Sequence, residues 1–245
     1  PGEIVVGERT VQAVRGAFEF DEPAVIAAKG KPEGVRCRRL LRPLSLQRPR
    51  GIRGLDSVFV GRDAELAVLE QAYESAVAAG RPWLATVVGD SGVGKTRLVR
   101  EFWQLLADRS PQPLCRTGRC VAYGRGVTYR PLAEVLREQL GVAEGEPATD
   151  LLRRLEPRQI LGLAFGLDVA EDLHPLVARE RLQQACVDLV EELAASRPLV
   201  LAVEDVHWAE EPLLDLLERL YRDARVPLLL LVTGRPEFLE QRARW

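Results

Sequence analysis

One eight-residue stretch constrains the fold of this chain more than any other feature. Residues 89–96 read Gly-Asp-Ser-Gly-Val-Gly-Lys-Thr, a glycine followed by four residues and then Gly-Lys-Thr. The apolar run Trp83–Val88 comes directly before it, and residues 96–107 carry apolar side chains at helical spacing after it. The pattern predicts a buried parallel strand that turns through a glycine-rich loop into a helix.

The residue types in this loop indicate phosphate binding. Glycines let the backbone curl so that several N–H groups face one phosphate, and the helix N-terminus adds partial positive charge. Lys95 would place a compact charge on the β- and γ-phosphates, and the Thr96 hydroxyl would be a ligand of Mg²⁺. A glycine-rich turn without a ligand is the alternative, and the flanking strand and helix argue against it. The expected nucleotide-binding residues of the loop are Gly89, Asp90, Ser91, Gly92, Val93, Gly94, Lys95 and Thr96.

A second apolar run, residues 199–203, ends in two acids, Glu204 and Asp205. ATP hydrolysis needs one carboxylate to hold Mg²⁺ and one to polarise the attacking water. Adjacent residues of a strand point to opposite faces, so the pair can divide these roles. We assign Glu204 to the metal and Asp205 to the water. The reverse assignment remains open, and so does a pair of exposed acids with no role.

A third apolar run, residues 228–232, ends in Thr233-Gly234-Arg235. Ligands of parallel sheets sit at the carboxyl ends of strands, so these side chains are expected near the γ-phosphate. Thr233 could orient water, and Arg235 could sense or stabilise phosphate charge. An ordinary surface arginine at a turn is the alternative for Arg235.

Three segments are expected along the chain. Residues 58–245 alternate strands and helices, which predicts an α/β fold with a mainly parallel sheet. Residues 1–41 read as a small α/β piece, and about forty residues cannot bury much core alone. Residues 42–57, rich in proline, glycine and arginine, read as a linker. The expected strands are 3–6, 18–28, 35–41, 83–88, 114–120, 199–203 and 228–232, and the expected helices are 8–15, 62–79, 96–107, 132–140, 180–195 and 211–223.

Charge and composition limit the classes of function. Seven arginines and no acid lie between residues 36 and 53, which suits either a nucleic-acid or membrane contact or, as we favour, a solvated connector. The net charge of −2 gives no bulk sign of nucleic acid, and no apolar run approaches the roughly 18 residues of a membrane span. With no leader-like segment, the chain is predicted to be cytoplasmic.

The cysteine, histidine and methionine content bears on metal binding and on the ends of the chain. The four cysteines form no C-x-x-C, and the two histidines offer no ligand spacing, which favours free, reduced cysteines over a zinc site. The chain has no methionine and starts at Pro1, so it is expected to be a segment of something longer or a processed product.

Five motifs in order give the part from residue 58 to 245 a family resemblance. It resembles the AAA-like P-loop ATPase domain of large bacterial signalling proteins, the signal-transducing (STAND-type) ATPases. The resemblance implies a three-layer α/β/α P-loop NTPase fold with a helical insertion, and it places Val60, Gly61 and Arg62 by the adenine. Glu204 stands where many relatives have aspartate, so ATP binding is implied more directly than hydrolysis. A further core strand and a helical lid would follow. The motifs are Phe59-Val60-Gly61-Arg62-Asp63-x-Glu65, the loop at 89–96, Gly118-Arg119-Cys120-x-x-Tyr123-Gly124, Arg179-Glu180-Arg181-Leu182 and residues 203–209.

Residues 1–41 resemble the last forty residues of a class III adenylate/guanylate cyclase domain, a ferredoxin-like fold. The features are PGEIVVGE, a short helix, Phe18-Glu19-Phe20, the KGKPEGV turn and an Arg-Arg-Leu-Leu strand. In that family a lysine of the turn reaches the substrate triphosphate, which here would be Lys29, our preference, or Lys31. The metal-binding aspartates and the transition-state Asn and Arg of the family lie before Pro1, so this chain is not expected to cyclise ATP.

Together these features predict an ATP-binding, Mg²⁺-dependent switch in a cyclase-linked signalling protein, with slow or no ATP turnover. Its partners would be ATP and ADP, an upstream cyclase region, and a downstream sensor or helical-repeat region. Nucleic acid is not expected for this segment, and neither is a membrane. The alternatives are a non-catalytic interaction module and the ATPase domain of a helix-turn-helix transcriptional regulator.

Overall fold

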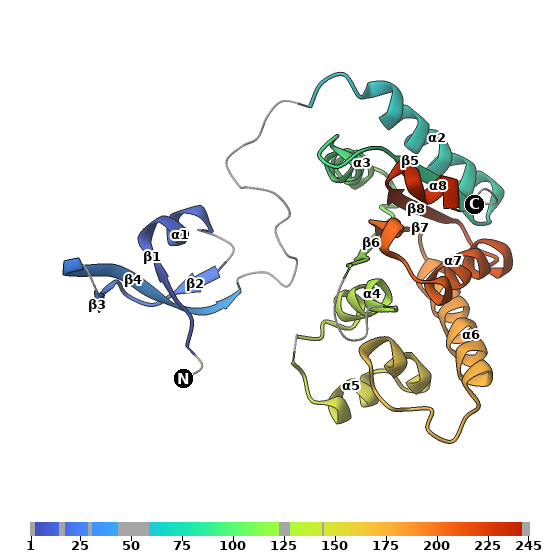
Figure 1. Ribbon diagram of the computed structural model, residues 1–245. Helices are drawn as coiled ribbons and strands as arrows, with labels where there is room; N and C mark the ends of the chain where they lie inside the picture. Colours follow the sequence, from blue (N-terminus) through green and yellow to red (C-terminus); the bar gives the residue numbers. More distant parts are fainter. Residues whose placement is uncertain are drawn as a thin grey trace. The chain divides into compact units, whose positions relative to one another are not determined.

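The computed structural model divides into two compact units, Pro1–Val58 and Phe59–Trp245 (Figure 1). It describes residues 3–14, 18–28, 31–43, 59–122, 128–143 and 145–241. We call the two parts the N-terminal unit and the C-terminal unit and treat each by itself. Most of the expected linker, residues 44–57, lies outside the described residues.

The N-terminal unit is built around one long strand. That strand, β4 (Lys31–Pro43), pairs antiparallel with each of the other three. The expected single strand 18–28 is in fact two, since the stretch 21–23 between them, which includes Pro23, is not in strand conformation. Only Val11 and Cys37 are buried apolar side chains among its described residues, which fits the small core expected. The other elements are β1 (Val5–Gly7), α1 (Glu8–Ala13), β2 (Phe18–Phe20) and β3 (Ala24–Ala28).

Three of the seven arginines between residues 36 and 53, a stretch that we call the basic run, form ion pairs with acids of the same unit. Arg38 pairs with Glu8 at 3.7 Å, and Arg42 Nε pairs with a Glu19 carboxylate oxygen at 2.5 Å. Arg39 bridges Glu3 at 2.7 Å and Asp21 at 2.8 Å. These arginines therefore do not form a surface of unbalanced positive charge, although they follow one another in the sequence without an acid.

The C-terminal unit is a four-stranded parallel sheet in the order β5-β8-β7-β6. Every residue of the two central strands is buried, as is usual for parallel strands covered on both faces. The predicted strands are confirmed, and the central two run one and two residues further than expected. The strands are β5 (Trp83–Val88), β6 (Leu114–Arg119), β7 (Leu199–Glu204) and β8 (Leu228–Gly234).

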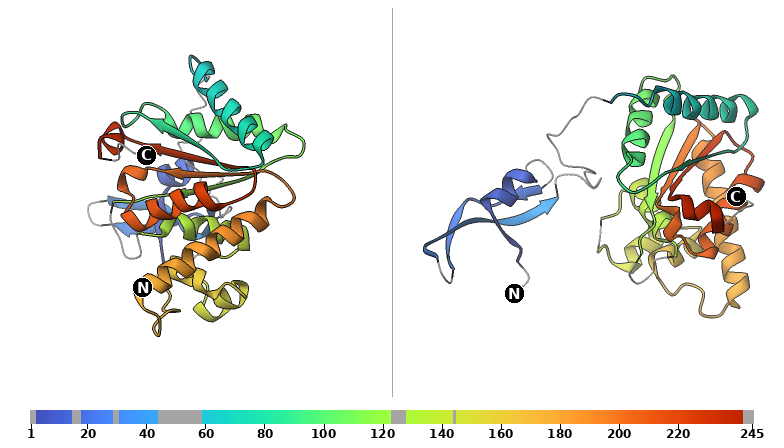
Figure 2. Two further views of the ribbon diagram at one scale, coloured as in Figure 1. Left: turned by 90° about the vertical axis from the view of Figure 1, so that its right-hand side faces the viewer. Right: turned by 45° about the horizontal axis from the view of Figure 1, so that its top comes forward.

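Helices cover both faces of the sheet (Figure 2), and alternating residues of the central strands pack into two separate core layers. Val200 and Leu229 face a cluster with Phe102, on the side of α2 (Asp63–Ala79) and α3 (Lys95–Ala107). Leu201 and Leu230 face the other side, covered by α4 (Arg130–Leu140), α6 (Pro175–Ala194) and α7 (Glu211–Asp223). The C-terminal unit is therefore the expected three-layer α/β/α fold of P-loop NTPases.

Several short elements escaped the sequence analysis. They are α5 (Ala148–Arg154), the 3₁₀ helices η1 (Gln159–Phe165) and η2 (Val206–Trp208), and α8 (Pro236–Gln241). Helix α6 starts five residues before the predicted position because Pro175 suits a first helical turn and His174 Nδ1 accepts the Leu176 N–H at 3.3 Å. Helices α4, α5, η1 and α6 all lie between β6 and β7 in the sequence, as the expected helical insertion.

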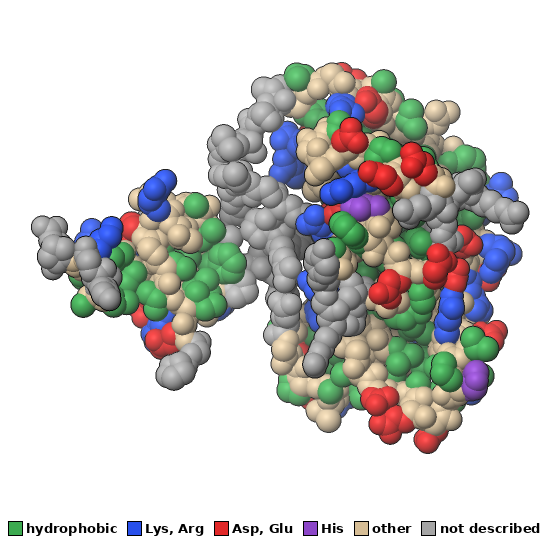
Figure 3. All heavy atoms as spheres, in the orientation of Figure 1, with side chains coloured by type: hydrophobic (Ala, Val, Ile, Leu, Met, Phe, Trp, Pro, Cys, Tyr) green, Lys and Arg blue, Asp and Glu red, His purple; other side chains and the backbone are tan. Residues whose placement is uncertain are grey.

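The face drawn in Figure 3 carries basic and acidic side chains interspersed over the C-terminal unit. No described helix is long and apolar enough to cross a membrane.

Gly118 allows α4 to rest on β6, and its substitution tests that contact. A Cβ built on Gly118 would lie 2.3 Å from the Pro131 carbonyl oxygen, a backbone atom that cannot move aside alone. We expect Gly118→Ala to lower the free energy of unfolding by about 1–3 kcal/mol, measured by urea denaturation. Gly162→Ala is the control, since its Cβ would meet only side-chain ends, at 3.1 Å and beyond. An equal loss in both variants would contradict the explanation.

Candidate nucleotide-binding site

The candidate site lies where three neighbouring parallel strands end. The predicted phosphate loop follows β5, the acids end β7, and Thr233 and Arg235 end β8. Strand β8 lies between the other two, with Val88 opposite Gly234, and the Gly89 N–H donates to the Gly234 carbonyl at 3.3 Å. The sheet therefore brings the three predicted groups of residues to one edge.

The loop closes around its own lysine. Helix α3 begins at Lys95, directly after Gly94, and the φ angles of Gly92 and Gly94 are 82° and 102°. Only glycine adopts such values at little cost. Lys95 Nζ donates to the carbonyl oxygens of Gly89 at 2.6 Å and Asp90 at 2.9 Å. The ammonium group thus lies inside the loop, against the backbone carbonyls of the loop's first two residues.

The segment expected at the adenine is tied to this loop. Arg62 Nη2 donates to the Val93 carbonyl at 3.1 Å, and its Nη1 pairs with Glu65 at the same distance. Val60 is 73% exposed, so its side chain is available for contact. The structure therefore places Arg62, the last of the predicted residues 60–62, beside the loop at 89–96.

The two acids have different environments. Glu204 ends β7 and is only 2% exposed. Asp205 has φ 59° and ψ 41°, and it is the one non-glycine residue with positive φ in the described part of the chain. Its N–H donates to Thr233 Oγ1 at 3.3 Å. Asp205 lies past the end of β7 in a left-handed conformation, so strand alternation does not set the direction of its side chain.

Arg119, noted in the sequence only as part of the Gly118-Arg119-Cys120 motif, is a site residue to which sequence reasoning gave no role. Its Nε donates to Asp205 Oδ2 at 2.7 Å, and its Nη2 forms an ion pair with the same oxygen at 2.6 Å. Burial opposes the charged guanidinium, but the hydrogen bond and charge of Asp205 prevail, so the pKa of Arg119 is raised. Arg119 is opposite Glu204 in the β6–β7 register. Its place at the end of a predicted strand was the available signal.

His207 and Trp208, noted in the sequence only as part of the motif at residues 203–209, follow Asp205 in the turn η2. The rings of His207 and Trp208 are 5.0 Å apart between centroids, and Arg235 Cζ lies 5.9 Å from the Trp208 ring centroid. Both imidazole nitrogens are inaccessible and make no hydrogen bond with the described residues. Burial, aided by Arg235 and Lys95 against the opposing charge of Asp205, lowers the pKa of His207.

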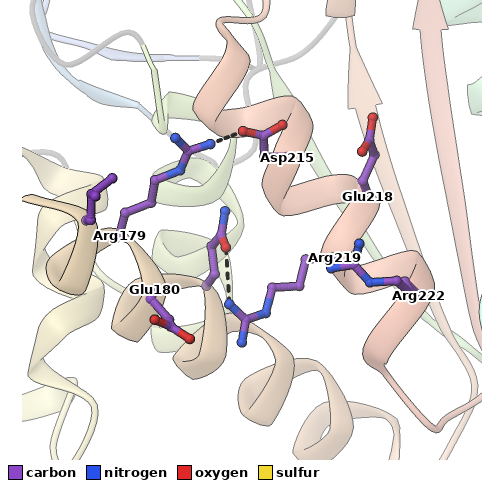
Figure 4. Close-up of a pocket in the computed structure, with 8 residues that line it drawn as sticks. Arg179, Glu180, Asp215, Glu218, Arg219 and Arg222 are labelled. Carbon is purple, nitrogen blue, oxygen red and sulfur yellow. Dashed lines mark hydrogen bonds and ion pairs between the residues drawn. The ribbon is translucent and has the colours of Figure 1, made fainter. Parts of the chain in front are cut away.

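A groove of about 380 Å³ lies elsewhere, between α6 and α7, and none of the predicted site residues lines it (Figure 4). Arg179 points across it to Asp215, and Arg219 Nη1 donates to Gln183 Oε1 at 3.2 Å. These contacts join the two helices. They give the Arg179 motif, noted in the sequence, a role in packing.

Metal-binding residues are sparse around the site. The described residues hold no group of three or more His, Cys, Asp or Glu side chains that could bind a metal. All four cysteines are free. Burial raises the pKa of Cys115 to about 11 and those of Cys120 and Cys186 to about 12, which keeps these thiols protonated.

Comparison with known proteins identifies the family. The model of the AAA ATPase domain matches residues 58–232, so the chain belongs to this family of nucleotide-binding domains. Uncharacterized protein R02095 of Rhizobium meliloti (strain 1021) is 27% identical over 259 aligned residues, which cover 98% of this chain and 25% of that protein. The chain thus spans about a quarter of that relative.

Similar solved structures include Cdc6p from Pyrobaculum aerophilum, with 17% identity and a TM-score of 0.45 over 78% of this chain and 43% of that one. Another is Drosophila ORC bound to DNA, with 13% identity and a TM-score of 0.34 over 71% of this chain and 80% of that one.

The lowered pKa of His207 makes a prediction about stability. As pH falls below the ordinary value of 6.5, the unfolded chain binds a proton that the folded site still refuses. The contribution of His207 therefore decreases with falling pH and levels off below its lowered pKa. We expect His207→Phe, which keeps a ring but does not titrate, to lose less unfolding free energy than the parent between pH 7 and pH 5 in urea denaturation. Parallel pH profiles would contradict this.

Proposed function

We propose that this chain carries an ATP-binding, Mg²⁺-dependent switch of a cyclase-linked, STAND-type signalling protein. The observation that carries the proposal is the placement of Lys95 inside a loop bounded by the ends of β5, β7 and β8. Nucleotide binding is the common property of the family to which the chain belongs.

In this proposal the loop, residues 89–96, wraps the phosphates and Lys95 neutralises the β- and γ-phosphates. Residues 60–62 contact the adenine. Arg62 supports this role because it is bonded to the loop through Val93. Thr233 orients water, and Arg235 senses the terminal phosphate.

The residues present also suit Mg²⁺, which prefers oxygen ligands. Thr96 would offer a hydroxyl and Glu204 a carboxylate, with phosphate and water completing the shell. Asp205 is less suited to the metal because Arg119 already neutralises its carboxylate through two short contacts. Glu204 therefore remains our choice for the metal and Asp205 for the water. Bound there, the ion would offset phosphate charge.

A switch fits these contacts better than rapid turnover. Lys95 is bonded to loop carbonyls and Asp205 to Arg119, so both groups have partners within the protein. A bound nucleotide would have to replace at least the contacts between Lys95 and the loop carbonyls. A ligand shifts a conformational equilibrium only by its different affinity for the two states, and such an exchange supplies that difference.

The cyclase link rests on the N-terminal unit. It has a four-stranded antiparallel sheet with one helix, and Lys31 starts β4 at the predicted turn. The preferred lysine, Lys29, lies outside the described residues. The Rhizobium relative aligns with 98% of the chain, which supports the joining of both units in one longer protein. We propose no cyclase activity for this chain alone.

Lys95→Ala tests the proposal. We expect the parent to bind ATP weakly in calorimetry and to be stabilised by it against heat, and the variant to lose at least tenfold in affinity because the phosphate charge is no longer matched. Arg81→Ala is the matched control, a cation removed just before β5, at the opposite end of that strand. Equal ATP affinity in parent and Lys95→Ala would refute the proposal. A parent that ATP does not stabilise would favour an interaction module.

The division of roles between the acids is tested through Mg²⁺. We expect Glu204→Gln to remove most of the gain in ATP affinity that Mg²⁺ gives the parent, and Asp205→Asn to keep it, since only Glu204 is assigned to the metal. The measurement is calorimetric titration with ATP in the presence of Mg²⁺ or EDTA. The opposite pattern would assign the metal to Asp205.

A further inference from the structure

Three arginines surround the candidate site, and one of them is held differently from the others. Arg119 is tied to Asp205, and Arg62 is tied to Glu65 and a loop carbonyl. Arg235 forms no ion pair with a described residue, and its guanidinium lies over the Trp208 indole at 5.9 Å. An aromatic face holds a cation without occupying its N–H donors, which stay available for an oxyanion.

The turn that carries the Trp208 indole, η2, is closed by two backbone hydrogen bonds. The backbone N–H of Trp208 donates to the Asp205 carbonyl and that of Ala209 donates to the Val206 carbonyl, each at 2.9 Å. Val206 is 1% exposed and packs close to Gly234, where an added Cβ would lie 3.2 Å from its Cγ2. The turn is thus fixed against the end of β8, the strand that leads into Arg235.

The His207 ring lies against the indole on this same turn. Its nitrogens make no hydrogen bond with described residues, an arrangement that buried polar atoms rarely show. Its ring is tilted by 43° to the Trp208 indole, a contact that does not use the imidazole nitrogens. His207, Trp208 and Arg235 form a run of successive ring and guanidinium contacts, which we call the Trp208 stack.

We propose that Trp208 is the positioning residue of Arg235, holding its guanidinium ready for the terminal phosphate and so setting the preference for ATP over ADP. The inference rests on the proposed function, in which Arg235 senses that phosphate. It also accounts for the exposure of Trp208, 44%, which is high for so large an apolar side chain. A residue whose only task was core packing would be buried.

The test compares the ratio of ADP to ATP dissociation constants across variants. We expect Trp208→Leu to lower this ratio about two- to fivefold, the range for an exposed cation–π contact. Trp208→Phe should restore part of the preference, because a smaller aromatic face remains. In an Arg235→Gln background, Trp208→Leu should have no further effect, since its partner is gone. Tyr221→Leu is the matched control, an aromatic of 48% exposure on α7, outside the stack.

Tryptophan fluorescence gives a reading that a merely structural role would not move. We expect ATP to change the emission of the parent more than ADP does, and this difference to vanish in Trp208→Phe and in Arg235→Gln. An unchanged ADP-to-ATP ratio in Trp208→Leu, while binding still depends on Lys95, would overturn the role of Trp208 alone. If the parent bound ATP no more tightly than Lys95→Ala does, the proposed function would be overturned, and this inference with it.

Discussion

The hydrogen-bonded position of β8 between β5 and β7 is the constraint on which the site depends. Parallel pairing puts the carboxyl ends of all three strands at one edge, and the register sets Gly234 beside Val88 and Val203 beside Val232. Every residue of β8 is buried, and its alternate side chains pack into the two core layers, so the strand is held on both faces. The phosphate loop, the acids and Arg235 are thereby positioned by packing that is far from their own chemistry.

Much of this arrangement could be predicted from the sequence because burial leaves a readable pattern. The apolar runs at 83–88, 199–203 and 228–232 predicted three strands, and the residues that end them predicted the candidate site. Short 3₁₀ and helical turns such as η1 and α8 carry too few residues for a period to show. Helix α6 begins earlier in the chain than the sequence predicted, because its first turn is set by Pro175 and His174 rather than by apolar spacing.

Contacts between side chains of different strands were the part that sequence reasoning could not reach. Nothing in the order of residues says that Arg119 meets Asp205, 86 positions away, through a hydrogen bond and an ion pair to one oxygen. The left-handed turn at Asp205 is equally hidden, because aspartate adopts that conformation only occasionally and local sequence does not demand it. The arginines between residues 36 and 53 show the reverse case: some that look unopposed in sequence meet acids of α1, of β2 and of the segment before β1.

The charged groups at the edge of the site have different partners within the protein. The strength of each contact decides how easily a ligand can replace that partner. A carboxylate engages Arg119 directly, so Arg119 can leave only if Asp205 gains another cation or a proton. Carbonyl oxygens hold Lys95, and a phosphate can replace them because it offers full negative charge where they offer dipoles. The indole holds Arg235 by its face and competes least of all. Under the proposed function, a nucleotide would therefore engage Lys95 and Arg235 before it disturbs the Arg119–Asp205 pair, so binding would not require that pair to separate.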